Sequence, residues 1–206
     1  MERKKTSEFI FDCAVCPTRC DGVSKMVYTF SNDVSFSEQH EKVIIEKINA
    51  GKKFIASKTK ESGYPDLQIA NEKHQIISYL EVKVQQRTFM SVEKIIPESN
   101  LKPSETVALN LSDLLRYFEI KKENGIPTSI VWVVLNRPCL VMQNEVLYYF
   151  QKIDELERIY NKEGDKRRFR RKSGEGDVVD GIHKGVTVNY HFSLKELKPW
   201  DPLSVQ

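Results

Sequence analysis

A β-prone segment from Gln75 to Gln85 constrains the fold of this chain more than any other part of its sequence. The segment is rich in branched and aromatic residues, as strands are. Alternate residues of a strand face opposite sides, so its apolar side chains share one face and its charged and amide side chains share the other. The first set is Leu80, Val82 and Val84, and the second is Glu81, Lys83 and Gln85. The pattern predicts a strand with one packed face and one polar face.

A hairpin would place a second carboxylate next to that polar face. Residues 66–70 form another β-prone run, and the polar residues 71–74 between the two runs are typical of a hairpin connection. The hairpin is expected to bring Asp66 beside Glu81 and Lys83. Carboxylate oxygens suit Mg²⁺, and a nearby lysine can stabilise negative charge that develops on a phosphate. The alternative is an ordinary solvated strand face, on which Glu-x-Lys is common.

A helix is expected before these strands. Residues 35–38 read Ser-Phe-Ser-Glu, which has the spacing of a capping box and predicts a helix start, and Gly51 is a typical stop. Glu41 lies three, four and seven residues before three isoleucines that share one helix face. An unpaired charge beside a buried face is costly, so a shared metal or substrate site would explain Glu41. The alternative is a carboxylate at the edge of the apolar stripe that reaches solvent.

The rest of the chain predicts an α/β arrangement. An amphipathic helix over residues 111–118 ends before Gly125, and residues 128–135 form an apolar run that suits a strand covered on both faces. Residues 87–107, which prolines interrupt, are expected to form an irregular loop with short elements. Further expected elements are a hairpin of residues 140–142 and 146–150, a helix over 154–161, a strand over 186–192 and a terminal turn capped by Ser193.

In this order, the motifs resemble the PD-(D/E)XK nuclease superfamily, which has the restriction-endonuclease-like fold. The resemblance covers residues 35–136 and rests on Pro65-Asp66, on Glu81-Val82-Lys83, and on the order helix, three strands, helix, strand. The first of the three strands is expected over residues 53–56. Archaeal Holliday-junction resolvases and type II restriction endonucleases are similar in this respect. The resemblance implies an α/β fold with a central mixed sheet flanked by helices.

The resemblance also implies a metal site and a catalytic residue. Asp66 and Glu81 would be metal ligands together with the backbone carbonyl of Val82, and Lys83 would be the catalytic lysine. The implied cofactor is Mg²⁺ or Mn²⁺.

Two further positions match the family less directly. Glu41 would be the family's helix-borne catalytic acid, and Gln85 stands where some members carry a polar residue beside the substrate. The implied substrate is DNA. A homodimer is implied for enzymes of this kind that cut both strands.

A basic segment in the C-terminal part is a second candidate for substrate contact. Residues 166–172 place six cations around Phe169, which could stack on an unpaired base or anchor the loop. Lysine and arginine side chains bind phosphate oxygens without reading sequence. The predicted DNA contacts are Arg167, Arg168, Arg170, Arg171 and Lys172. The alternative is a solvated loop whose charge is partly neutralised by neighbouring acidic residues.

Three cysteines lie close together near the N-terminus, at Cys13, Cys16 and Cys20. Their spacing fits Zn²⁺ or an iron–sulfur cluster if Cys139 or His40 supplies a fourth ligand. Some relatives of the nuclease superfamily carry iron–sulfur clusters with one cysteine before the nuclease motifs and three after them, which is the reverse of the order here. The alternative is ordinary free cysteines.

Length and composition set the remaining expectations. The 206 residues, 40% of them apolar, are expected to form one nuclease-like domain. Residues 1–34 would be an N-terminal extension, 35–136 the nuclease core and 137–206 a C-terminal elaboration. The net charge of +3 does not by itself indicate a nucleic-acid-binding protein. Since the sequence has no long apolar run and no signal segment, a cytoplasmic protein without a membrane partner is expected.

Three functions fit these observations. The first is a Mg²⁺-dependent DNA endonuclease that hydrolyses phosphodiester bonds, with a role in restriction or another defence system. The second is a catalytically silent module with a nuclease fold that binds DNA or a protein. The third is a zinc- or iron–sulfur-containing nucleic-acid-binding protein in which the Glu-x-Lys face is ordinary.

Overall fold

A computed structural model of the chain describes residues 30–86, 88–135, 137, 146–170, 178–179, 182–183 and 188–200. A six-stranded sheet lies at its centre, with the strand order β1-β2-β3-β5-β6-β11. The strands are β1 (Ile55–Lys58), β2 (Leu67–Ala70), β3 (Ile76–Gln85), β5 (Thr128–Val134), β6 (Leu147–Lys152) and β11 (Lys198–Pro199). β3 and β5 pair in parallel, and every other neighbouring pair is antiparallel.

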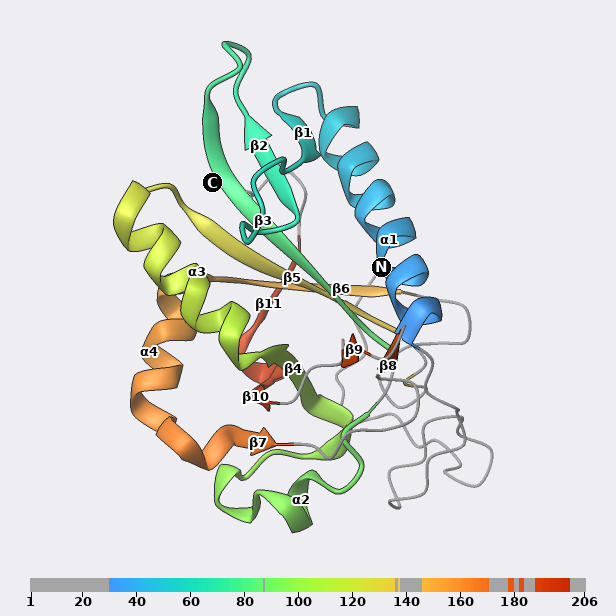
Figure 1. Cartoon of the computed structure of the whole chain (residues 1–206), viewed down its shortest axis with the longest axis vertical. Coiled ribbons are helices and arrows are strands. Elements are labelled where there is room, and N and C mark those ends of the chain that lie inside the picture. Colours follow the sequence, from blue (N-terminus) through green and yellow to red (C-terminus); the bar gives the residue numbers. More distant parts are fainter. Residues whose placement is uncertain are drawn as a thin grey trace.

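Helices cover both faces of this sheet (Figure 1). α1 (Phe30–Ala50) packs on one face, where Ile44 and Ile48 join the apolar side chains of β3 in one core. α3 (Leu111–Asn124) and α4 (Ile153–Glu163) pack on the other face in a second core. The predicted fold class, α/β with a central mixed sheet flanked by helices, is confirmed.

A second, three-stranded sheet with the order β4-β10-β7 packs beside the α3 layer. Its strands are β4 (Thr106–Asn110), β10 (Val188–Ser193) and β7 (Arg168–Arg170). A two-stranded ladder joins β8 (Val178–Val179) to β9 (Ile182–His183). The short helical elements are α2 (Val92–Ile95), η2 (Pro97–Ser99), η3 (Pro103–Glu105), η4 (Gly164–Arg167) and η6 (Leu194–Glu196).

Local sequence explains the main elements. All seven residues of β5 are buried, as an apolar strand covered on both faces requires. α3 begins where the Asn110 side chain accepts from the N–H of Ser112, and it ends at Gly125, whose φ of 68° suits glycine. Ser193 and Glu196 form a capping box at η6. The predicted connection at 71–74 is a tight turn in which the Asn71 side chain accepts from two backbone N–H groups.

Three expectations about the elements differ from the structure. α1 begins at Phe30, so the capping-box sequence at 35–38 lies inside the helix, where Ser35 and Glu38 are exposed and do not interrupt it. The strand expected at 53–56 is displaced to Ile55–Lys58. The segment 87–107, expected to be irregular, ends in the first two residues of β4, since Thr106 and Val107 pair with β10 far along the chain. Within the described residues, none of the helices is both long and apolar enough to span a membrane.

Candidate active site

The hairpin register brings the two predicted metal ligands together. β2 and β3 pair with Leu67 opposite Leu80, so one further step places Asp66 opposite Glu81. The backbone N–H of Asp66 donates to Glu81 Oε2 at 3.2 Å, and the backbone N–H of Val82 donates to Asp66 Oδ2 at 2.9 Å. Each of the two carboxylates is therefore held by the backbone of the opposite strand.

Lys83 completes this cluster from the same face of β3. Its Nζ lies 2.5 Å from Glu81 Oε1 and 3.9 Å from Asp113 Oδ2 in the first turn of α3. The Tyr117 hydroxyl, one turn further along α3, donates to Glu81 Oε2 at 2.6 Å. Glu81 is only 2% exposed, so these groups replace the water that it would otherwise bind. The predicted sharing of one strand face by Glu81 and Lys83 is observed.

The electrostatics of the cluster are unusual for surface groups. Burial and the neighbouring Glu81 carboxylate raise the pKa of Asp66 to about 7. Burial alone would lower the pKa of Lys83, but the charges of Glu81 and Asp66 outweigh it and raise that pKa above its ordinary value. Burial and Glu81 likewise raise the pKa of Tyr117, which keeps its hydroxyl protonated as a donor. The cluster therefore holds a stable cation beside crowded carboxylates, a combination concentrated at functional sites.

Glu41 lies on the α1 side of the sheet with a different partner. Glu41 is 8% exposed, and its Oε2 is 3.0 Å from Nζ of Lys58 at the end of β1. Its charge is felt by Asp66, whose pKa it raises together with stronger causes, burial first. Glu41 is therefore buried and paired with a lysine, not solvated at the edge of the stripe, and its role in a metal or substrate site stays a prediction.

Gln85 continues the polar face of β3 beyond Lys83. Its side-chain oxygen accepts from the backbone N–H of Ala108 at 3.2 Å, which ties the end of β3 to β4. The residue is partly exposed and lines a pocket between these strands.

The predicted DNA contacts of the basic segment divide into three groups. Arg168 and Arg170 are exposed on β7, and Arg171 and Lys172 lie outside the described residues. Arg167 departs from the prediction. It is buried at 6% exposure, and its guanidinium lies 2.6 Å from Glu196 Oε2, so the charge of Arg167 is used to hold η4 against η6 and is not available to a phosphate.

A group of three or more Asp, Glu, His or Cys side chains placed to hold one metal ion is not found among the described residues. The predicted ligand set is smaller, with two such side chains, Asp66 and Glu81, and one backbone carbonyl. Cys13, Cys16, Cys20 and Cys139 lie outside the described residues, and the predicted Zn²⁺ or iron–sulfur site with them. His40 lies on α1 with its ring against Phe36.

Three residues of the cluster were not expected from the sequence. Tyr117 lies three residues after Leu114 in the apolar stripe of α3, where a tyrosine is indistinguishable from a core residue. Asp113 is in the first turn of α3, a common place for an acid that favours the helix dipole. Lys58 ends a four-residue strand, and its neighbour Glu41 is on a different element. Only tertiary structure brings these side chains to the site.

Comparison with solved structures finds ten matching chains. The crystal structure of Hjc, a Holliday junction resolvase from the archaeal hyperthermophile Archaeoglobus fulgidus, matches with a TM-score of 0.38 and 10% sequence identity. The match covers 79% of this chain and 84% of that chain. No family model matches the sequence, and no curated protein matches it.

Proposed function

We propose that this protein is a metal-dependent DNA endonuclease. The observation that supports the proposal is the meeting of Asp66, Glu81 and Lys83 at the β2–β3 hairpin, with direct hydrogen bonds or ion pairs linking all three residues. Two carboxylates and a lysine are a minimal set for cleavage of a phosphodiester, and they occupy the positions that the PD-(D/E)XK resemblance implies.

The donor set fits a divalent cation. Hard cations such as Mg²⁺ or Mn²⁺ prefer carboxylate and carbonyl oxygens, and Asp66, Glu81 and the Val82 carbonyl would hold one here. The pKa of Asp66 is raised because burial and the Glu81 charge disfavour its ionised form. A bound cation would offset the cost of both. When bound, the ion would polarise a phosphoryl oxygen and lower the pKa of water.

The protein's own groups have separate roles in the proposed reaction. A water oxygen forms a bond to phosphorus, the P–O bond to the leaving nucleotide breaks, and one proton passes from the water to the leaving oxygen. Lys83 stays protonated and stabilises the negative charge on the phosphate. Tyr117 orients Glu81 through its 2.6 Å hydrogen bond and is a positioning residue. Glu41 and Lys58 form a second charged pair next to Asp66.

The proposed DNA contacts are the cations that remain accessible. Arg168 and Arg170 on β7 would bind the phosphate backbone together with Arg171 and Lys172, which follow in the chain. Arg167 is left out because it is buried in an ion pair. Cleavage of both strands of a duplex would require a second copy of the site, as in a homodimer.

A cleavage assay tests the proposal. Supercoiled, single-stranded and branched DNA are incubated with Mg²⁺, Mn²⁺ or EDTA and with wild type, Asp66→Asn, Glu81→Gln or Lys83→Met. Cleavage by wild type in Mg²⁺ or Mn²⁺, and its loss in EDTA and in all three variants, is expected. Lys121→Met is the matched control, because Lys121 pairs with Asp154 on the outer helices. DNA that is bound and never cut by wild type would favour the binding-module alternative.

A further inference from the structure

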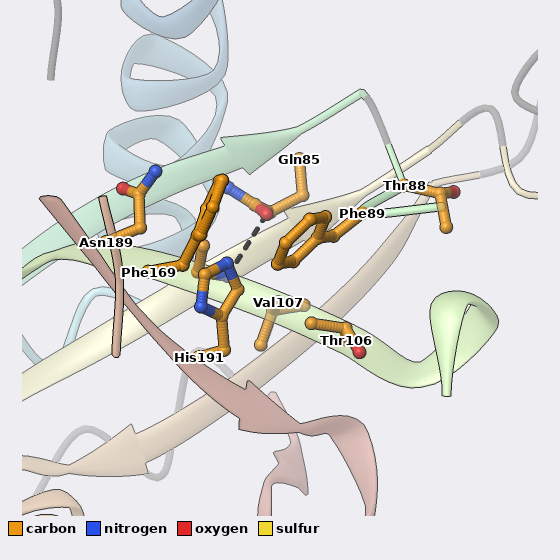
Figure 2. Close-up of a pocket in the computed structure, with 9 residues that line it drawn as sticks. Gln85, Thr88, Phe89, Thr106, Val107, Phe169, Asn189 and His191 are labelled. Atoms are coloured by element: carbon orange, nitrogen blue, oxygen red, sulfur yellow. Dashed lines mark hydrogen bonds between the residues drawn. The ribbon is translucent and has the colours of Figure 1, made fainter. Parts of the chain in front are cut away.

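A pocket opens at the end of β3, next to the candidate active site. It encloses about 260 Å³ between the segment that follows β3 and the second sheet (Figure 2). That volume is just below the range of small-molecule pockets, roughly 300–1,000 Å³, so it suits one small group rather than a long ligand. Its principal side chains are Gln85, Phe89, Phe169, Asn189 and His191.

Strand alternation places Phe169, Asn189 and His191 on the same face of the second sheet. Asn189 pairs with Phe169 on β7, and His191 pairs with Ala108 on β4, so all four face the pocket. The intervening Tyr190 points into the apolar core on the other face. The face that lines the pocket therefore carries two rings, one amide and one small apolar side chain.

Three rings form a continuous stack along one wall of the pocket. The Phe89 ring centroid lies 5.0 Å from that of Phe169 and 4.8 Å from that of His191, with interplanar angles of 30° and 35°. Figure 2 shows the three rings drawn side by side over the strands. Phe89 and Phe169 are half-buried and also pack on a small apolar cluster around Val92, which fixes them in place. Fixed aromatic rings at an open pocket are a stacking platform for a planar ligand.

Polar groups beside the rings can read the edge of such a ligand. His191 Nδ1 lies 3.1 Å from the carbonyl of Arg167, which can only accept, so Nδ1 carries the proton. Burial lowers the pKa of His191 to about 4, so the ring is neutral and its Nε2 is an acceptor. The Asn189 amide supplies a further donor and acceptor, whereas the Gln85 oxygen already accepts from the Ala108 N–H. Donors and acceptors of this kind match the edges of nucleobases.

The distance between the pocket and the charged cluster is close to the length of one nucleotide. Gln85 lines the pocket and is two residues after Lys83 on the same face of the same strand. Two strand residues span about 7 Å, roughly the reach of one extended nucleotide. A strand with a phosphate at Lys83 could therefore place a neighbouring base in the pocket.

We propose that this pocket binds one unpaired nucleobase of the strand whose phosphate lies at Asp66, Glu81 and Lys83. This proposal rests on the proposed nuclease function and names its substrate class: DNA with a base that is single-stranded, bulged, at a branch or turned out of the duplex. A paired base has both faces covered by its neighbours and cannot enter a stack of side chains.

Equilibrium binding in EDTA, where cleavage is not expected, tests the proposal. The probes are a short single-stranded oligonucleotide and an abasic oligonucleotide with the same sugar–phosphate backbone. Wild type is expected to bind the base-bearing strand about 5- to 150-fold more tightly, the range that corresponds to one stacked base. Phe169→Leu should lose this difference and keep the affinity for the abasic strand, whereas Phe169→Tyr should keep both. Phe36→Leu, a half-buried phenylalanine on α1, is the matched control.

A second variant guards against a packing effect of Phe169→Leu. Asn189→Ala removes a partly exposed amide from the pocket without touching the ring stack, and should reduce base-dependent affinity by a smaller factor. Melting curves by circular dichroism identify any variant that has lost its fold. Equal affinity of wild type for the two strands, or an equal loss on both strands in Phe169→Leu, would overturn the proposal.

The two proposals fail in different ways. Base-dependent binding without any cleavage in Mg²⁺ or Mn²⁺ would overturn the nuclease and support the pocket. Metal-dependent cleavage with no base-dependent binding would support the nuclease and overturn the pocket.

Discussion

Two acid–lysine pairs flank Asp66, and they are built differently. Glu81 and Lys83 share one strand, and Glu81 also accepts from the Tyr117 hydroxyl and the Asp66 backbone. Glu41 and Lys58 join a helix to an edge strand. The side chain of Lys83 is 28% exposed, whereas that of Lys58 is 50% exposed. The first pair is held by several groups, and the second has a lysine that water solvates.

The difference shows how a fold can fix one charge and leave another adjustable. If Lys83 moved away from Glu81, the buried carboxylate would be left without a compensating positive charge, which is costly. Lys58 can exchange Glu41 for water more easily than Lys83 can leave Glu81, because half of the Lys58 side chain is already exposed to solvent. We therefore expect the Glu81–Lys83 pair to be the chemical centre and the Glu41–Lys58 pair to adjust the field at Asp66.

The largest effect is expected on the cleavage rate, when each of the two lysines is replaced in turn. Lys83→Met should lower the cleavage rate by on the order of 100- to 1000-fold, since it removes a preorganised positive charge from the transition state. Lys58→Met should lower it by less than about 10-fold, since its charge is partly screened by water. Single-turnover cleavage with excess enzyme measures both rates. Equal losses in the two variants would break the distinction between the pairs.

Tyr117 tests why the first pair is the more rigid one. Tyr117→Phe leaves the buried Glu81 short of one hydrogen bond, which should cost about 1–3 kcal/mol of the free energy of unfolding. Tyr190→Phe is the control, because the buried Tyr190 hydroxyl has no hydrogen-bond partner within the described part of the chain. Urea denaturation in EDTA gives both free energies. A larger loss in Tyr190→Phe than in Tyr117→Phe would contradict this account of Glu81.

The metal-free protein should be less stable with the Asp66 carboxylate between the two pairs than with an amide at this position. Asp66→Asn removes the repulsion by Glu81 and can still accept from the Val82 N–H, so it should stabilise the metal-free fold by about 1 kcal/mol, or about 2–4 °C in melting temperature. Mg²⁺ should raise the melting temperature of wild type and leave that of Asp66→Asn nearly unchanged. Scanning fluorimetry with and without Mg²⁺ measures this. A lower melting temperature for Asp66→Asn in EDTA would show that the carboxylate is not strained.

The smallest effect is expected on the free energy of unfolding when the exposed Lys58 is replaced. Lys58→Met should change the free energy of unfolding by less than about 1 kcal/mol, and added salt should reduce that difference further. Urea denaturation at low and high ionic strength measures it. A loss as large as that of Tyr117→Phe would mean that the Glu41–Lys58 pair is as firmly held as its counterpart.

Much of the central sheet could be predicted from the sequence, because its signals are local. Alternation along β3, the polar turn at 71–74 and the apolar run of β5 each specify an element without knowledge of the rest. The position of Asp66 opposite Glu81 followed from one hairpin. The predicted start of α1 was wrong, because a capping-box sequence also fits an exposed helix face.

The parts that could not be predicted depend on distant pairings. β4 pairs with β10 about eighty residues later in the chain, and no local pattern in residues 106–110 indicates this. The basic neighbours of Arg167 predict a DNA contact, but η6 supplies Glu196 as its partner. The aromatic stack joins Phe89, Phe169 and His191 from three separate segments. Such sites are assembled only by the tertiary fold.

One continuous strand, β3, carries Glu81 and Lys83 of the charged cluster and Gln85 of the pocket. The part of β3 from Glu81 to Gln85 pairs residue by residue with β5, from Ile130 to Val134, which holds it in a fixed register. If a nucleic acid binds at both places, β3 would set a fixed distance between the bound phosphate and the bound base. The scissile bond would then fall at a constant offset from the extruded nucleotide, whatever the surrounding sequence.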